Sequence, residues 1–328
     1  MTPQASRFRV PTPFEPSTSP TTRRRTQVHA GLAASLEAHA PHDGRFELAL
    51  PGTFAIRLSA PSRVPVHATL QPMLCVVAQG AKTITLGHQV FEYNPSRMLI
   101  FSVDLPVSGQ VRRATPTEPY LCFRLDLDPF RIAELALRVF PSGVPMPDNP
   151  LGLYVGEVTE EIVDAATRLV ALMSQPEEAR LLGPLLIDEI LIRLLRSPVG
   201  ARVAQIGSDD SGLRQIAKAV AGIRANFSQP LRIEALARMA HMSLSSFHQR
   251  FKDVTGMSPL QYQKALRLEQ AKRLMLGHAM DAKRAASEVG YQSASQFTRE
   301  YARHFGSTPR RDIARLRAEN PFVAASSR

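Results

Sequence analysis

The chain has 328 residues, of which 44% are hydrophobic, enough to bury two separate cores. It contains no apolar run near the ~20 residues of a membrane helix, so a membrane protein is not expected. Its two cysteines are too few for a disulfide framework or a metal cluster, which favours a cytoplasmic protein.

The N-terminal segment, residues 1–29, is rich in Pro, Thr, Ser and Arg and contains Arg23, Arg24 and Arg25 in a row. A segment of this composition has too little apolar surface to pack, so a disordered basic tail is predicted. It also lacks the apolar stretch of a secretory signal peptide.

Residues 46 to about 126 have the pattern of an all-β region, with short apolar runs separated by turn residues such as Gly80, Gly87 and Pro106. This spacing predicts a sandwich or barrel, and a cupin-like β-barrel or jelly roll is the preferred form. The predicted strands are Thr53–Leu58, Met73–Ala78, Lys82–Leu86, Val90–Tyr93, Met98–Val103, Gly109–Arg113 and Leu121–Leu125.

Two helices are predicted next. The first has one apolar stripe that includes Ile162 and Leu169, whereas the second, about Glu177 to Arg196, is apolar nearly all round. A helix without a polar face is buried on several sides, either inside one chain or between the β-domain and a second subunit. We favour a homodimer held by the helices of this 30–196 domain, with a linker at 197–212. The candidate dimerisation residues are Ile162, Leu169, Leu185 and Leu191.

The predicted β-region contains no recognisable catalytic or metal-binding pattern. His67 and His88 are isolated and no His-x-His pair occurs, so neither a metal nor another cofactor is expected, and no enzymatic activity is predicted. A β-domain without chemistry more naturally holds a small molecule. Candidate effector-binding residues are Cys75, Lys82, Arg112 and Tyr120. Cys75 is interpreted as a packing residue, with thiol sensing as the alternative.

The C-terminal part, residues 213–328, contains one helical pattern twice, about fifty positions apart. Each copy predicts a short helix, a tight turn and a second helix that begins at a Ser, at about 231–255 and 281–305. This is the anatomy of a helix-turn-helix, whose second helix enters the major groove of DNA. The matching pairs are Ser243 and Ser293, Ser245 and Ser295, Phe247 and Phe297, Phe251 and Tyr301, Gly256 and Gly306, and Pro259 and Pro309.

Capping patterns support the repeat. Ser293 and Gln296 have the spacing of a capping box, and so do Ser258 and Gln261, with Pro259 at the first helical position. The helix that follows Ser258, to about Leu276, spans about 27 Å at ~1.5 Å per residue. That length suits two recognition helices in neighbouring major-groove segments, because the DNA repeat is about 34 Å.

The charge is confined to the same part of the chain. Residues 213–328 hold 20 Lys and Arg against 8 Asp and Glu, a net of +12, whereas residues 1–212 hold 20 against 21, a net of −1. Such a basic domain is typical of phosphate binding, and double-stranded DNA is the expected partner. The candidate DNA-binding residues are Ser243, Ser245, Ser246, His248, Gln249 and Lys252 in the first copy, and Ser293, Ser295, Gln296, Thr298, Arg299 and Arg303 in the second.

Residues 213–317 resemble the DNA-binding domain of the AraC/XylS family of bacterial transcription regulators. The resemblance is strongest over Ala286–Ser293, Phe297–Arg299 and Phe305–Pro309. The first copy departs from the family pattern at two positions, because His241 replaces the usual turn Gly and Gln249 replaces a common base-contacting Arg. Cys75–Lys82 and Phe123–Asp126 are similar to the N-terminal domain of one branch of this family.

The resemblance implies an α+β protein whose C-terminal all-α domain has a double helix-turn-helix. It further implies a cytoplasmic, dimeric regulator, nucleoid-associated when bound to DNA, that responds to an effector and activates transcription through contact with RNA polymerase. Two alternatives stay open. One is a cupin-type metalloenzyme fused to a DNA-binding domain, and the other is a sequence-tolerant architectural DNA-binding protein.

Overall fold

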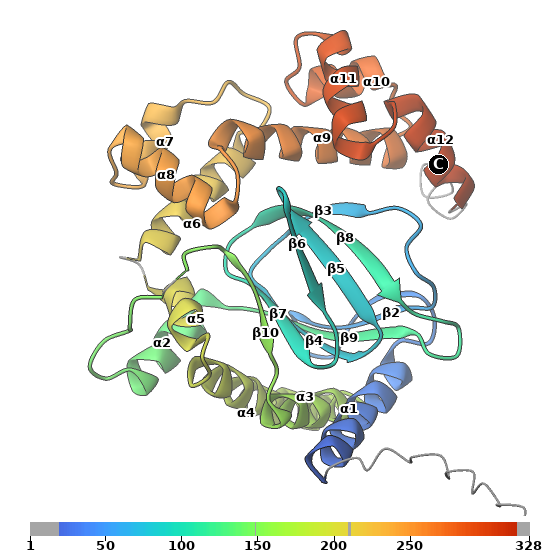
Figure 1. The fold of residues 1–328 in the computed structure, drawn as a ribbon, viewed down its shortest axis with the longest axis vertical. Helices are drawn as coiled ribbons and strands as arrows, with labels where there is room; N and C mark the ends of the chain where they lie inside the picture. The colour runs from blue at the N-terminus through green and yellow to red at the C-terminus, as the bar shows by residue number, and fades with distance from the viewer. Residues whose placement is uncertain (1–19, 148, 209–210, 320–328) are drawn as a thin grey trace, which may run out of the picture.

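The computed structural model describes residues 20–147, 149–208 and 211–319. The chain folds into an N-terminal β-sandwich flanked by helices and a C-terminal helical domain packed against the opposite side of the sandwich (Figure 1). The predicted α+β class is confirmed. Within the described ranges, no helix has the length and apolar character needed to cross a membrane.

The sandwich consists of two antiparallel sheets, with strand orders β1-β2-β9-β4-β7-β10 and β3-β8-β5-β6. All seven predicted strands are present, and β1, β3 and β10 are additional. The strands are β1 (Gly44–Glu47), β2 (Thr53–Leu58), β3 (Val66–Leu70), β4 (Met73–Gln79), β5 (Ala81–Leu86), β6 (Gln89–Tyr93), β7 (Arg97–Phe101), β8 (Leu105–Arg113), β9 (Tyr120–Asp126) and β10 (Leu153–Glu157).

The sheets do not close into the predicted cupin-like barrel. In the described part of the chain no hydrogen-bonded strand pair joins one sheet to the other, so the domain is an open sandwich. Closure is one way to protect exposed strand edges, and covering them is another. Here the C-terminal helix α9 (Pro259–Gly277) packs against the edge strand β3 and covers part of one of these edges.

A helical layer lies along the six-stranded sheet, on the side away from the C-terminal domain (Figure 1). Its members include α1 (Pro20–His39), α3 (Glu160–Leu172) and α4 (Pro176–Leu195), and α1 contacts α3, β4 and β9. The sequence predicts a disordered tail to residue 29, but helix α1 begins at residue 20. Its partly apolar second half, with Leu32 and Leu36 fully buried, holds it on the sheet. Residues 1–19 lie outside the described residues.

Two further helices lie beside this layer. Helix α2 (Pro129–Val139) follows β9, and α5 (Gly200–Gly207) occupies much of the predicted linker 197–212. The linker is therefore partly helical, because Val203 and Ile206 are buried and α5 packs against α2. Residues 209 and 210 of the linker lie outside the described residues.

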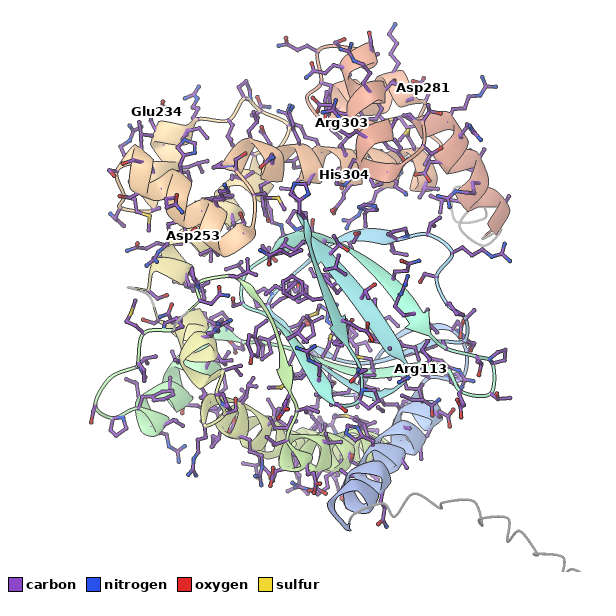
Figure 2. The ribbon with its side chains drawn as sticks, in the orientation of Figure 1. Arg113, Glu234, Asp253, Asp281, Arg303 and His304 are labelled. Atoms are coloured by element: carbon purple, nitrogen blue, oxygen red, sulfur yellow. The ribbon has the colours of Figure 1, made fainter. Side chains whose placement is uncertain are left out.

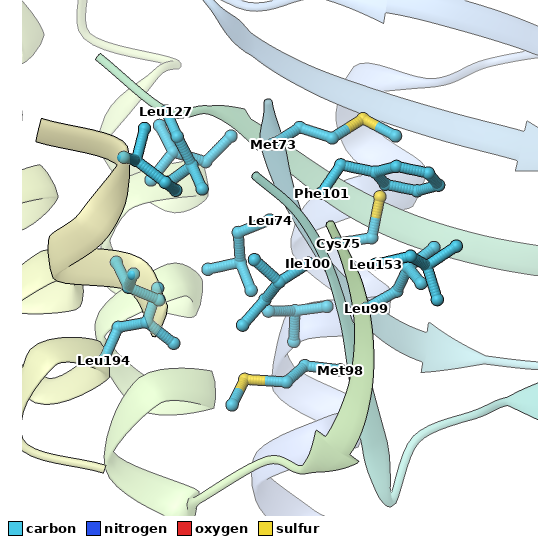
Figure 3. Close-up of a cluster of buried hydrophobic side chains, with 14 of the residues drawn as sticks. Met73, Leu74, Cys75, Met98, Leu99, Ile100, Phe101, Leu127, Leu153 and Leu194 are labelled. Carbon is cyan, nitrogen blue, oxygen red and sulfur yellow. The ribbon is translucent and has the colours of Figure 1, made fainter. Parts of the chain in front are cut away.

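The core of the N-terminal domain has two sides, which Figure 3 shows around β4 and β7. Leu74 and Ile100 point toward Leu194 of α4, whereas Cys75 and Phe101 point to the opposite face. Six of the seven residues of β4 are buried because both faces of this strand are covered.

The C-terminal domain is all-α, as predicted. Helix α9 runs between two helical units and contacts elements of both. Its helices are α6 (Gly212–Ala225), α7 (Ile233–Met239), α8 (Leu244–Thr255), α9, α10 (Ala282–Glu288), α11 (Ala294–Phe305) and α12 (Pro309–Glu319).

The two domains are joined by polar contacts as well as apolar packing. The Arg224 guanidinium lies 2.5 Å from the Asp104 carboxylate, and the Tyr262 hydroxyl donates to the Asp104 carbonyl at 2.8 Å. The Gly152 amide donates to the carbonyl of Val254 at 2.7 Å. These contacts fix the C-terminal domain against the sandwich in this structure.

Candidate nucleic-acid interface

The two predicted helix-turn-helix motifs are present, formed by α7 and α8 and by α10 and α11. Their turns have matching backbone hydrogen bonds. The Met242 amide donates to the Ala237 carbonyl at 2.9 Å, and the Tyr291 amide donates to the Ala286 carbonyl at 2.9 Å. The sequence repeat therefore corresponds to a repeat of structure.

The second helix of each unit, α8 or α11, begins and ends in the same way. The hydroxyls of Ser243 and Ser293 each accept a hydrogen bond, at 3.3 Å, from the amide three residues later. Gly256 and Gly306 follow these helices with φ of 72° and 74°, a left-handed conformation that glycine adopts without strain.

The predicted capping box at Ser293 is only half formed. The Ser293 hydroxyl accepts the Gln296 amide, but the Gln296 side chain donates to the Glu300 carboxylate at 3.2 Å instead of returning to Ser293. In a complete box the side-chain oxygen of Gln296 would accept the Ser293 amide, but the hydrogen bond that its side-chain nitrogen donates to Glu300, one turn further along α11, holds the side chain away from Ser293. The predicted box at Ser258 and Gln261 is complete and begins α9.

An aromatic face holds each of these helices in place. Phe247 and Phe251 of α8, like Phe297 and Tyr301 of α11, are fully buried. The rings pack 5.6 Å apart in both pairs. Because residues four apart share one side of a helix, this burial leaves the opposite face of α8 and of α11 in solvent.

The exposed faces hold the predicted DNA-binding residues. Eleven of the twelve are exposed, and Thr298 is half-buried, with its hydroxyl donating to the Ala294 carbonyl at 2.9 Å. Gln249, in the first unit, donates to Asp253 of its own helix at 2.8 Å. Arg299 projects from α11 into solvent. The exposed residues are Ser243, Ser245, Ser246, His248, Gln249, Lys252, Ser293, Ser295, Gln296, Arg299 and Arg303.

Lys252 and Arg303 also line a cavity of about 840 Å³ between the two domains, which the sequence does not predict. Its walls come from β3, β5, β8 and the β5–β6 turn on one side and from α8, α9 and α11 on the other. Its lining contains three Lys and Arg side chains and two carboxylates, those of Glu269 and Glu300, and Glu300 pairs with Lys264. The basic and imidazole groups are His67, His88, Lys252, Lys264, Arg303 and His304.

Two imidazoles meet at this boundary. The rings of His67 and His304 lie 4.7 Å apart, and Figure 2 shows His304 where α11 approaches the sandwich. Burial is the main cause that lowers the pKa of each to about 4; the charge of Lys272 contributes at both residues, and that of His304 contributes more than Lys272 at His67. Both imidazoles are therefore neutral at pH 7.

Glu269 of α9 is also at the boundary and is 6% exposed. It accepts a hydrogen bond from the Thr69 hydroxyl at 2.8 Å, while burial raises its pKa to about 7. These partners are 200 residues apart in the chain, so no local pattern in the sequence indicates that they meet.

Three of the four predicted effector-binding residues gather inside the sandwich. Cys75 and Tyr120 are buried, and the Lys82 ammonium lies 5.9 Å from the centre of the Tyr120 ring. Arg112 is exposed and donates to Gln110 at 3.1 Å, away from the other three. The Cys122 thiol and burial raise the pKa of Cys75 well above its ordinary value, which keeps its thiol protonated.

The predicted dimerisation residues divide into two groups. Ile162, Leu169 and Leu191 are at most 2% exposed, so they pack within their own chain. Leu185 is 63% exposed, and its neighbour Leu181 is 76% exposed. The apolar surface open to a second subunit is thus on the first half of α4. Nowhere in the described ranges do three His, Cys, Asp or Glu side chains approach closely enough to hold a metal ion.

Two family models match the chain. The AraC-type transcriptional regulator N-terminus matches residues 49–202, and a helix-turn-helix domain matches residues 236–315. Together they cover both structural domains.

Similar proteins include two bacterial transcriptional activators. RclR of Escherichia coli, named as RCS-specific, is 39% identical over 89 residues, which are 27% of this chain and 31% of RclR. VirF of Yersinia enterocolitica is 28% identical over 161 residues, which are 49% of this chain and 59% of VirF. The chain therefore spans about a third to three fifths of these curated relatives.

A solved structure of ToxT from Vibrio cholerae has the same fold, with a TM-score of 0.50 at 10% identity, over 80% of this chain and 97% of ToxT. The fold and the two motifs define a two-domain protein with a double helix-turn-helix. The chain belongs to the AraC family of transcriptional regulators.

Proposed function

We propose that the chain is a sequence-specific DNA-binding regulator that activates transcription, with α8 and α11 contacting bases in two neighbouring segments of the major groove. The observation that supports this most directly is the pair of equivalent helices, each with its aromatic face buried and its polar face exposed. The net +12 of residues 213–328 supplies the attraction to phosphate. Contact with RNA polymerase is part of the proposal and is supported by family membership.

Arg299 provides the sharpest test. Its guanidinium is exposed on α11, and Arg to guanine is the commonest specific contact in the major groove. Arg299→Ala should weaken binding to the specific site by about 1–3 kcal/mol, and the preference at one base pair should relax. Binding to random DNA at the same salt concentration should change far less.

Arg284→Ala is the matched control, because Arg284 is also exposed in the second unit but lies on α10. This substitution removes the same charge and should weaken specific and random DNA equally. Should Arg299→Ala behave like the control, Arg299 contacts phosphate and the proposed base contact is wrong. A wild-type protein that binds specific and random DNA equally would instead be the architectural alternative.

We further propose that the regulator responds to an anionic small molecule bound in the cavity between the domains. The support is the cavity itself, which is of ligand size and has Lys252 and Arg303 in its walls beside Glu269 and the Lys264–Glu300 pair. The cluster of Cys75, Lys82 and Tyr120 inside the sandwich is the competing location. It is less favourable because Cys75 and Tyr120 are buried in the core of the sandwich.

Homodimerisation through α4 completes the proposal. The exposed pair Leu181 and Leu185 supports it, because large exposed apolar side chains that cluster on a helix are typical of interfaces. The metalloenzyme alternative has no comparable observation in its favour, since the matching family models are a transcriptional regulator N-terminus and a helix-turn-helix domain.

A further inference from the structure

Arg267 lies near the middle of α9, where the two helix-turn-helix units come together. Its guanidinium donates to three carbonyls of the α6–α7 connection in the first unit, those of Phe227 (2.7 Å), Ser228 (3.1 Å) and Gln229 (3.0 Å). It also donates to the Gly290 carbonyl of the second unit at 3.0 Å. One side chain thus ties both units to α9.

The chemistry suits arginine in particular. A guanidinium has five N–H donors in a fixed plane and no acceptor, so it can satisfy several converging carbonyls at once. Two of these carbonyls also accept hydrogen bonds from Gln263, which is 2% exposed and donates to Phe227 at 2.9 Å and to Gln229 at 2.7 Å. The connection is therefore held at fixed positions rather than by apolar packing alone.

The two units also touch directly at Gly290. A Cβ placed there would lie 1.9 Å from the Ser228 carbonyl oxygen, a distance that no side chain tolerates. The equivalent turn residue of the first unit is His241, which has φ of 52° and an exposed side chain. Because this turn accepts a non-glycine residue at His241, the close contact with Ser228 is the main reason that position 290 requires glycine.

The contact continues to the second recognition helix. The Tyr291 ring lies 5.9 Å from the Arg267 guanidinium carbon, and its hydroxyl donates to Glu300 of α11 at 2.8 Å. Glu300 pairs with Lys264 of α9 at 2.7 Å. Glu300 is next to Arg299 in α11, so the base-contacting face of that helix is oriented by the same network.

We propose that Arg267 is a positioning residue that sets the separation and rotation between α8 and α11, and thereby the number of base pairs between the two halves of the DNA site. This inference rests on the proposed function, in which both helices contact DNA. One base pair more or less shifts a half-site by roughly 3.4 Å and rotates it by about 35°. A rigidly clamped pair of units cannot follow that change, whereas a loosened pair can.

The experiment compares full-length variants on duplexes with the native spacing, with one base pair added or removed between the halves, and with each half alone. Wild type should lose roughly tenfold or more in affinity when the spacing changes. Arg267→Ala should bind each half alone like wild type. It should also lose affinity for the duplex with the native spacing, so that the ratio of its affinities for the native and the altered spacing falls toward one.

Two further variants keep the inference testable if Arg267→Ala fails to fold, as judged by circular dichroism. Gly290→Ala leaves Arg267 and its charge in place but pushes the two units apart, and this variant should lose its preference for the native spacing in the same way. Arg267→Lys keeps the charge without the planar set of donors, and it should fall between wild type and Arg267→Ala.

The controls are Arg273→Ala, which removes an exposed guanidinium from α9, and His241→Ala, which alters the turn that lacks the contact between units. Both should retain the spacing ratio of wild type. An Arg267→Ala or Gly290→Ala protein that is folded and keeps the wild-type ratio overturns the inference. A wild-type protein indifferent to spacing would instead overturn the proposed two-helix contact with DNA.

Discussion

Substitution of Asp312, a buried residue of α12, should strongly destabilise the second helix-turn-helix unit. Its side chain is fully buried and accepts hydrogen bonds from Tyr301 of α11 (2.9 Å), Lys272 of α9 (2.8 Å) and Arg315 of its own helix (2.6 Å). Three helices therefore meet at one carboxylate. Removing its charge leaves two cations without their partner in a small core.

The magnitude of the loss follows from these contacts. Asp312→Asn keeps the volume and can still accept from Tyr301, but it loses the charge that pairs with Lys272 and Arg315. Breaking a buried ion pair costs about 3–5 kcal/mol. Because the side chains of Lys272 and Arg315 are 19% and 34% exposed, water offsets part of this. We expect a loss of about 2–3 kcal/mol in the free energy of unfolding.

Urea unfolding at pH 7, followed by circular dichroism, measures this loss. Asp253→Asn is the matched control, since Asp253 accepts from Gln249 on the surface of α8 and should change stability by less than about 0.5 kcal/mol. If the two substitutions cost the same, the argument that Asp312 ties the three helices together is refuted.

The pH dependence has a definite sign. Burial alone would raise the pKa of Asp312, but hydrogen bonds from Lys272 and Arg315 outweigh it and hold the pKa below its ordinary value. The stabilisation is thus fully present above about pH 4 and is lost as the pH falls through the lowered pKa of the folded state. The difference between wild type and Asp312→Asn should be constant from pH 8 to 5 and shrink only in stronger acid.

Two further predictions concern the proposed dimer and the proposed effector. Leu181→Asp combined with Leu185→Asp should give a folded monomer by analytical ultracentrifugation, because both side chains are exposed. Leu191→Asp should instead unfold the N-terminal domain, because Leu191 is buried. A folded dimer in the double variant would place the interface elsewhere. Benzoate, hexanoate or inorganic phosphate at millimolar concentration should raise the melting temperature of wild type but not of Ser108→Trp, which fills the cavity between the domains. Equal shifts in both proteins would exclude that cavity as the binding site.

The sequence predicts well those elements whose formation depends on residues that are close together in the chain. Short apolar runs between turn residues identify seven strands, most of them within one or two residues. Ser258 with Gln261 marks the start of α9 because capping involves neighbours in the chain. The recognition helices follow from the same logic. Four-residue spacing of Phe297 and Tyr301 is enough to assign the buried face.

The elements that the sequence does not predict depend on distant partners. Helix α1 has a polar, basic first half and is held by Leu32 and Leu36 against a sheet formed later in the chain. The edge strands β3 and β10 are short and obtain their hydrogen bonds from β8 and β7. Whether two sheets close into a barrel depends on what covers their edges, and no local pattern specifies that.

The proposed response to an effector requires the N-terminal domain to favour one arrangement of the DNA-binding helices over another, and this domain contacts both helix-turn-helix units. It touches the first unit where Gly152 donates to Val254, and the second unit where His67 packs against His304. It also touches α9 between them, where Thr69 donates to Glu269. A ligand in the cavity at this boundary shifts the protein between arrangements only to the extent that it binds them with different affinity. Because Arg267 holds the two units at one separation, such a shift would move α8 and α11 together, changing access to DNA while leaving the spacing of the site unchanged.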